Sequence, residues 1–84
     1  MNIKISRAAR KQLSKLDEQT RNRILSSLYK LREDPGLVDI KKIKTKTDRL
    51  RMRVGEYRVV LSVDRGNKVY RVIEVGHRRD IYRD

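Results

Sequence analysis

The chain has 84 residues, with 23 Lys and Arg against 11 Asp and Glu, a net charge of +12 at pH 7, one histidine and no cysteine. This length predicts a single domain over residues 1–84, and the composition excludes disulfide, thiolate and His-rich metal sites. No apolar run approaches transmembrane length and the first residues do not form a signal peptide, so we expect a cytoplasmic protein with no membrane partner. The positive charge favours a polyanion such as nucleic acid as the partner.

The first part of the chain predicts one strand and two helices. Asn2 to Ile5 alternates apolar and polar residues, which is typical of a strand. Ser6 and Asp17 are the predicted N-caps of the two helices, and Pro35 ends the second helix. Each helix has one apolar face, formed by Ala9, Leu13 and Leu16 in the first and by Ile24, Leu28 and Leu31 in the second.

The segment from Leu37 to Lys44 follows neither a strand nor a helix period. We interpret it as a loop that runs into an irregular edge of the sheet, with Lys41, Lys42, Lys44 and Lys46 directed outward. Such lysines could contact RNA or could discourage pairing with another chain at the edge, and the sequence leaves both roles open. The candidates for RNA contact are Lys42, Lys44 and Lys46.

The segment from Leu50 to Arg58 predicts a β-hairpin. Apolar and basic residues alternate up to Gly55, and the alternation resumes at Tyr57. A Gly-X pair between two such runs is typical of a two-residue turn in which glycine takes the positive φ of the first position. This turn predicts one wholly apolar side, with Val54 opposite Tyr57, Met52 opposite Val59 and Leu50 opposite Leu61.

The other side of this hairpin sets Arg53 directly opposite Arg58, with Arg51 opposite Val60 and Arg49 further along. Opposed residues in an antiparallel pair have Cβ atoms only ~5 Å apart, and like charges there are destabilising. A bound phosphate backbone would supply the missing negative charge. An ordinary solvated strand face, with the arginines splayed into water, explains these residues equally well when they are taken alone.

Val69 to Val75 predicts the last strand, after a loop at Asp64 to Lys68. Its apolar residues fall on both parities, which favours a central strand covered on more than one side. Residues 76–84 are expected to leave the sheet. The order of a strand, a helical hairpin and an antiparallel meander predicts an α+β fold.

The side chains available for chemistry are Arg, Lys, Tyr and one histidine. Arginines stabilise negative charge on phosphoryl oxygens, and His77 is a natural acid or base near neutral pH. Such a set suits RNA cleavage by attack of the RNA's own 2′-hydroxyl, with no metal or other cofactor. Plainer interpretations exist: His77 as a structural residue, Arg78 and Arg79 as a solvated pair, and Tyr82 as a cap on the core.

Residues 50–61 (LRMRVGEYRVVL) and 72–82 (VIEVGHRRDIY) together resemble the RelE group of the RelE/ParE toxin superfamily. The likeness covers nearly the whole chain, including the opening strand, the helical hairpin and Lys42 to Lys44. It implies a RelE-like, microbial-ribonuclease-like fold and a type II toxin that enters the ribosomal A site and cuts messenger RNA, inhibiting translation. It also implies a cognate antitoxin, with contact to operator DNA only through the antitoxin complex.

The resemblance implies a catalytic set on the hairpin and near the end of the chain. It comprises Arg51, Arg53, Arg58 and Arg78, with Tyr82 stacking on a base. Further RNA or phosphate contacts are expected from Lys42, Lys44, Lys46, Arg49 and Arg79.

This chain departs from the best-known member of the group, which has lysines at the positions of Arg51 and Arg53. An arginine effectively cannot lose its proton. We therefore predict that His77 takes or relays a proton and that the arginines act as electrostatic clamps. Two alternatives stay open: a ParE-like poison of DNA gyrase, which has no nuclease chemistry, and a catalytically inactive relative that only binds RNA.

Overall fold

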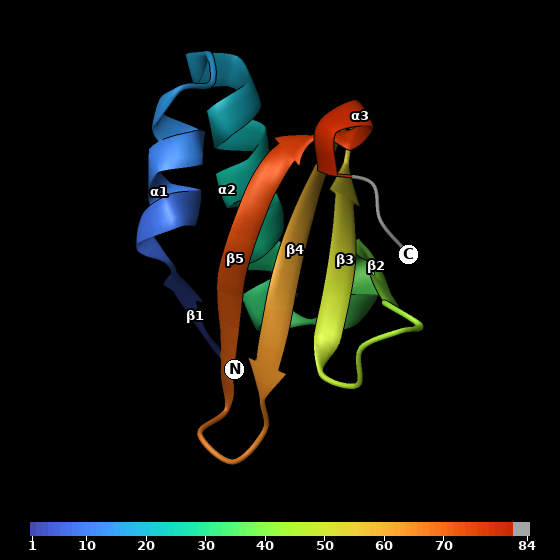
Figure 1. Cartoon of the computed structure of the whole chain (residues 1–84). Helices are drawn as coiled ribbons and strands as arrows, with labels where there is room; N and C mark the ends of the chain where they lie inside the picture. The colour runs from blue at the N-terminus through green and yellow to red at the C-terminus, as the bar shows by residue number, and fades with distance from the viewer. Residues whose placement is uncertain (82–84) are drawn as a thin grey trace.

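The computed structural model describes residues 1–81, with side chains described as far as Arg79 (Figure 1), so Tyr82 lies outside the described residues. Within this part of the chain, no helix is long and apolar enough to cross a lipid bilayer. The elements are β1 (Asn2–Ile5), α1 (Arg7–Ser14), α2 (Glu18–Glu33), the 3₁₀ turn η1 (Pro35–Leu37), β2 (Asp39–Lys42), β3 (Arg49–Val54), β4 (Tyr57–Asp64), β5 (Val69–His77) and α3 (Arg78–Ile81).

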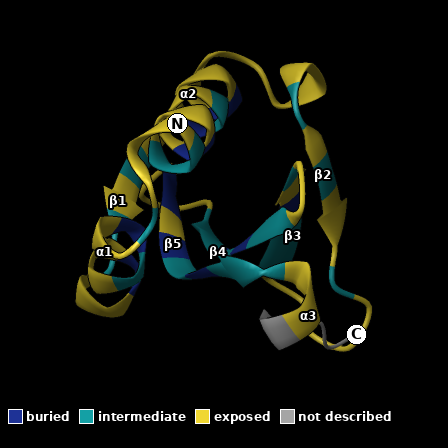
Figure 2. Ribbon diagram, turned by 90° about the horizontal axis from the view of Figure 1, so that it is seen from above, coloured by how far each residue is buried: buried dark blue, intermediate teal, exposed yellow. Residues whose placement is uncertain are grey.

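The strands form a five-stranded sheet in the order β1-β5-β4-β3-β2. The strands β2 to β5 form the predicted antiparallel meander, and β1 pairs parallel to β5 at the far edge. Helices α1 and α2 lie together on one side of the sheet, with α1 to the left of β5 and α2 behind β5 and β4 in Figure 1. The short α3 lies on the other side at the end of β5 (Figures 1 and 2). The predicted α+β fold is confirmed.

Side-chain caps begin both long helices at the predicted residues. The Oγ of Ser6 accepts a hydrogen bond from the N–H of Ala9 (3.1 Å), three positions into the helix. Asp17 accepts from both the hydroxyl (2.7 Å) and the N–H (3.1 Å) of Thr20. These bonds favour the carboxylate form and hold the pKa of Asp17 below its ordinary value of 3.8.

The core lies between the two helices and the sheet face that they cover. Alternate strand residues point to opposite sides, so the apolar residues of β3 and β4 gather mainly on this face. Figure 2 shows the buried residues gathered along the sheet and the inner sides of the helices. The largest fully buried side chains are Ile24, Leu31, Met52, Val59, Leu61 and Val72.

A β-bulge changes which residues of β5 face the helices along the strand. Val60 of β4 pairs with Glu74, whereas the next residue, Leu61, pairs with Val72. The extra residue, Ile73, reverses the parity of the strand. Val72 therefore faces the helices on one side of the bulge and Val75 does so on the other. Val69 and Tyr70, which precede the bulge and point to opposite faces, are both buried, so part of this strand is covered on both sides.

Two further expectations need correction. Residues 39–42 form a regular strand that pairs with β3, not an irregular edge, because Asp39 to Lys42 align in register with Arg53 to Leu50. The last strand does not end at Val75: it continues through Gly76 and His77, which pair with Arg58 and Tyr57 of β4.

Candidate functional site

The β3–β4 hairpin has the predicted register in full. Val54 pairs with Tyr57 and Arg53 pairs with Arg58 across a two-residue turn. Gly55 has a φ of +59°, the left-handed conformation that the turn requires and that L-residues with a Cβ rarely adopt. The turn thereby fixes which residues of both strands face the helices and which face away from them.

Three of the predicted catalytic arginines meet on the face of the sheet away from α1 and α2. Arg51, Arg53 and Arg58 line a hollow of about 70 Å³, together with Asp39 and Lys41 of β2. Four cations and one carboxylate therefore surround this hollow. Such an excess of positive charge attracts an anion of the size of a phosphate group.

Like charges oppose each other on this face. Arg53 and Arg58 are direct partners across the ladder, where like charges repel each other. Arg49 lies on the same face but opposite Ser62, at the other end of β3. Its Nε is buried and has no hydrogen-bond partner among the described residues, so a donor is left unsatisfied on this face.

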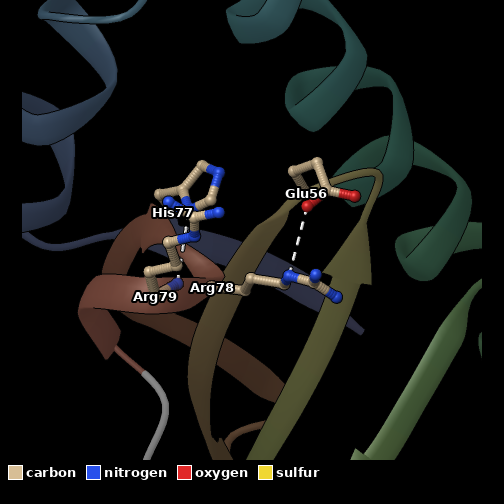
Figure 3. Close-up of polar contacts among 4 residues, drawn as sticks. All are labelled: Glu56, His77, Arg78 and Arg79. Carbon is tan, nitrogen blue, oxygen red and sulfur yellow. Dashed lines mark hydrogen bonds and ion pairs between the residues drawn. The ribbon is translucent and has the colours of Figure 1, made fainter.

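Arg78 does not line the hollow but reaches toward the β3–β4 turn. Its Nε lies 3.1 Å from Oε1 of Glu56, and the two side chains are 51% and 61% exposed. The N–H of Arg78 also donates to the backbone oxygen of Glu56 at 2.9 Å. Figure 3 shows this side chain directed toward Glu56 and away from His77. Arg78 is thus held beside the turn, with its guanidinium accessible to an anion.

His77 lies on the side of the sheet opposite to the arginines. It pairs with Tyr57, which packs against the core, and the two rings meet edge to face at 5.5 Å. Its Nδ1 accepts a hydrogen bond from the N–H of Arg79 at 3.2 Å (Figure 3), so the ring proton of the neutral form is on Nε2. The structure does not bring His77 together with Arg51, Arg53 and Arg58. Tyr57 has the packing role that its place on the apolar side indicates.

The register of β2 brings one of the four outward lysines to the hollow. Lys41 pairs with Arg51 and lines the hollow, whereas Lys42 pairs with Leu50 and has the parity of the helix-covered face. Lys44 and Lys46 are exposed in the turn between β2 and β3, outside the hollow. Asp39 is the residue of the hollow that sequence reasoning missed, and the alternation of Asp39, Ile40 and Lys41 is the signal that could have found it.

The remaining predicted contacts lie at the end of the chain. Arg79 is exposed in α3, and Tyr82 is outside the described residues. Among the described side chains, no group of three or more His, Asp or Glu could hold a metal ion. The side chains that line the hollow place an excess of positive charge on an open sheet face.

Comparisons with known proteins agree with this architecture. The family model of the ParE toxin of the type II toxin-antitoxin system parDE matches residues 3–82. The archaeal RelE in complex with RelB from Pyrococcus horikoshii OT3 is 28% identical, over 92% of this chain and 93% of that chain, with a TM-score of 0.78. The RelB–RelE antitoxin–toxin complex from Methanococcus jannaschii is 28% identical, over 94% of each chain, with a TM-score of 0.75.

A more distant likeness extends to the fold alone. The YoeB dimer from Staphylococcus aureus is 20% identical over 92% of this chain and 95% of that chain, with a TM-score of 0.72. No curated protein matches the chain. The similar structures thus include proteins of more than one name on one scaffold.

Proposed function

We propose that this chain, which belongs to the ParE toxin family of type II toxin–antitoxin systems within the RelE/ParE superfamily, inhibits translation by cutting messenger RNA on the ribosome. The observation that carries the proposal is the hollow on the open sheet face, where Arg51, Arg53 and Arg58 converge. Two arginines opposed across a ladder repel each other unless an anion lies between them, so a bound phosphate would stabilise this arrangement.

The arginines suit stabilisation of charge during cleavage of a phosphodiester. When a 2′-hydroxyl attacks the adjacent phosphorus, negative charge builds on the phosphoryl oxygens. Guanidinium groups hold such oxygens with fixed, often bidentate hydrogen bonds. The arginines of the hollow are already in place for this, so little reorganisation is needed when the charge develops. Arg78, beside the turn, would add a fourth guanidinium to the same phosphate or to the next one.

Proton transfer needs a group other than the arginines. Arginines do not act as bases, and the imidazole of His77 lies across the end of the sheet from the hollow. A role for His77 in taking or relaying a proton stays a prediction, and it requires the ring to leave Tyr57. Base stacking by Tyr82 also stays a prediction.

The positive charge of the open sheet face also favours binding of an acidic antitoxin. RelE from P. horikoshii and from M. jannaschii were each solved with RelB, and we propose that this chain likewise has a cognate antitoxin. Its acidic segments would neutralise the cationic face, and contact with operator DNA would occur only through the complex. The site of action would be the cytoplasm, where ribosomes and messenger RNA meet the toxin.

Primer extension on a reporter transcript in a purified translation reaction tests the activity. Wild-type toxin should cut at codons in the A site only when ribosomes are present, and Arg51→Ala and Arg78→Ala should each lose most of the cleavage. His77→Ala tests whether His77 takes or relays a proton. A full cleavage rate across pH in this variant would show that His77 has no part in the mechanism. Absence of any cut by wild-type toxin would refute the proposed activity.

A ParE-like action on DNA gyrase is the second candidate, because the matching family model is that of the ParE toxin of parDE. A gyrase supercoiling assay distinguishes the two activities. Inhibition of supercoiling together with intact messenger RNA would support the second candidate. The loss of both activities would support a relative that only binds RNA.

A further inference from the structure

A second cationic surface lies on the other side of the β3–β4 turn. A groove of about 620 Å³ runs between α2 and the segment from η1 to β2, and it ends at the turn itself. Its walls are mostly polar, with apolar surface from Leu37, Val38 and Val54. A groove of this composition suits a hydrated, charged strand better than an apolar helix, whose binding requires a hydrophobic floor.

One face of α2 supplies the polar wall of this groove. The side chains recur every three to four residues, which places them on one stripe of the helix. They carry two cations, two amides and two hydroxyls, all capable of donating hydrogen bonds to phosphate or ribose oxygens. They are Gln19, Asn22, Arg23, Ser26, Ser27 and Lys30.

The groove and the arginine hollow share two residues. Asp39 and Arg53 line both, at the end of the sheet where β2 begins and β3 ends. A chain that leaves the hollow over this end therefore enters the groove directly. The cations of the groove are Arg23, Lys30 and Arg53 against the single carboxylate of Asp39, so the positive potential continues from one surface to the other.

Arg23 lies at the end of the groove that meets the β3–β4 turn. A Cβ built on Gly55 would lie 3.2 Å from Nη2 of Arg23, so the guanidinium rests against the backbone of the turn. Arg23 also lines a smaller hollow with Thr20, Glu56 and Tyr57 beside the same turn. Among the side chains described, no carboxylate forms an ion pair with Arg23 or Lys30. Their charges are thus available to a ligand.

We propose that this groove binds the single-stranded RNA that flanks the scissile phosphate, with Arg23 and Lys30 contacting successive parts of its backbone. The two residues are seven apart on α2, a rise of about 10 Å, so they would contact different phosphates. The inference rests on the proposed function, because it assigns the arginine hollow to the phosphate that is cut. It adds a binding track that depends on the length of the RNA.

RNA length and salt dependence provide the test. Anisotropy of fluorescent 2′-O-methyl RNAs, which cannot be cleaved, is measured with free toxin for a trinucleotide and for an oligonucleotide of about ten residues. Arg23→Gln/Lys30→Gln should weaken binding of the longer RNA by about tenfold or more and leave the trinucleotide unaffected. Removing one phosphate interaction lowers the salt slope by about 0.7, so the double variant should reduce it by about 1.4.

A matched control separates the groove from net charge. Arg7→Gln/Lys11→Gln removes one arginine and one lysine from exposed positions on α1 that line neither the groove nor the hollow. It should bind the longer RNA nearly as well as the wild type does. Arg23→Lys/Lys30→Arg keeps both charges and should bind the longer RNA with close to wild-type affinity. Thermal unfolding checks that all variants fold.

The possible results separate the groove inference from the proposed function. Equal binding of the longer RNA by the groove variant and the α1 control would refute the groove, even while wild-type toxin cuts messenger RNA. Unchanged RNA affinity with weakened antitoxin binding would make the groove a protein interface and would equally refute the inference. Failure of wild-type toxin both to bind RNA and to cut it would refute the inference together with the proposed function.

Discussion

The two faces of the β3–β4 hairpin are made by alternate residues of the same strands, yet they differ in almost every physical property. On the helix-covered face, Met52, Val59 and Leu61 are 0% exposed and packed in the core. On the open face, the arginines converge around a hollow. Each buried apolar side chain contributes about 1.5–3 kcal/mol to folding, whereas like charges across a ladder cost up to about 1 kcal/mol. One face can therefore stabilise the fold while the other is free to bind.

The largest expected effect is on the covered face. Leu61→Ala removes fully buried methyl groups and should lower the free energy of unfolding by about 2–5 kcal/mol. In a domain of this size that is a large fraction of the total stability. Urea denaturation followed by circular dichroism measures the change. The neighbouring Val60→Ala, on the open face, should cost clearly less, and equal losses would contradict the division into two faces.

The next effect is on the open face and concerns activity. Arg53→Ala should reduce messenger RNA cleavage on ribosomes by about 10²–10³-fold, as expected for loss of one fixed donor to the developing charge. Its melting temperature should stay equal or rise slightly, because the variant no longer opposes Arg58. Arg65→Ala, exposed in the β4–β5 turn, is the control and should keep full activity. A stability loss as large as that of Leu61→Ala would show that the arginine face is structural.

The turn that joins the two faces should be sensitive to a single methyl group. Gly55→Ala places a Cβ at a φ of +59°, which costs about 1–2 kcal/mol, and crowds the guanidinium of Arg23 at 3.2 Å. Chemical denaturation measures this loss. Gly66→Ala is the matched control, because a Cβ there would meet nothing closer than Oδ1 of Asp64 at 3.7 Å. If both variants are equally stable, the left-handed conformation does not define the register.

A smaller effect is expected where a carboxylate lies beside the cations. Glu56→Gln removes the charge that pairs with Arg78, and both side chains are more than half exposed. The stability change should stay within about 1 kcal/mol, as for other exposed pairs. RNA affinity, measured by anisotropy, should increase because Arg78 no longer has an anionic competitor. Weaker binding of RNA would mean that Glu56 positions Arg78 for its ligand.

The smallest effect concerns acid stability and lies far from both faces. The hydroxyl and N–H of Thr20 lower the pKa of Asp17 in the folded protein, so the unfolded chain binds the proton more tightly. The resulting stability is fully present above the unfolded pKa of 3.8 and is lost as pH falls through the lower folded value. Asp17→Asn keeps a cap without a titrating group and should show a flatter loss of melting temperature in this acid range. If the melting temperature of the variant falls with pH as steeply as that of the wild type, Asp17 does not contribute to the loss of stability in acid.

Features that depend on neighbours along the chain could be predicted from the sequence. The two N-caps, the apolar stripes of the helices and the hairpin around Gly55 all follow from side chains within a few residues of each other. The hairpin register is local too, because a two-residue turn leaves only one way to align β3 with β4. For this reason the opposition of Arg53 and Arg58 could be predicted without a structure.

Features that depend on pairing between distant segments required the tertiary structure. The register of β2 against β3 brought Lys41 rather than Lys42 to the arginines. The bulge in β5 reversed the parity of that strand, and its pairing with Tyr57 placed His77 away from the hollow. A shift of one residue exchanges the faces of a strand, and nothing within β2 or β5 alone specifies that shift. The groove beside Arg23 likewise exists only because α2 and β2 are held on either side of the turn.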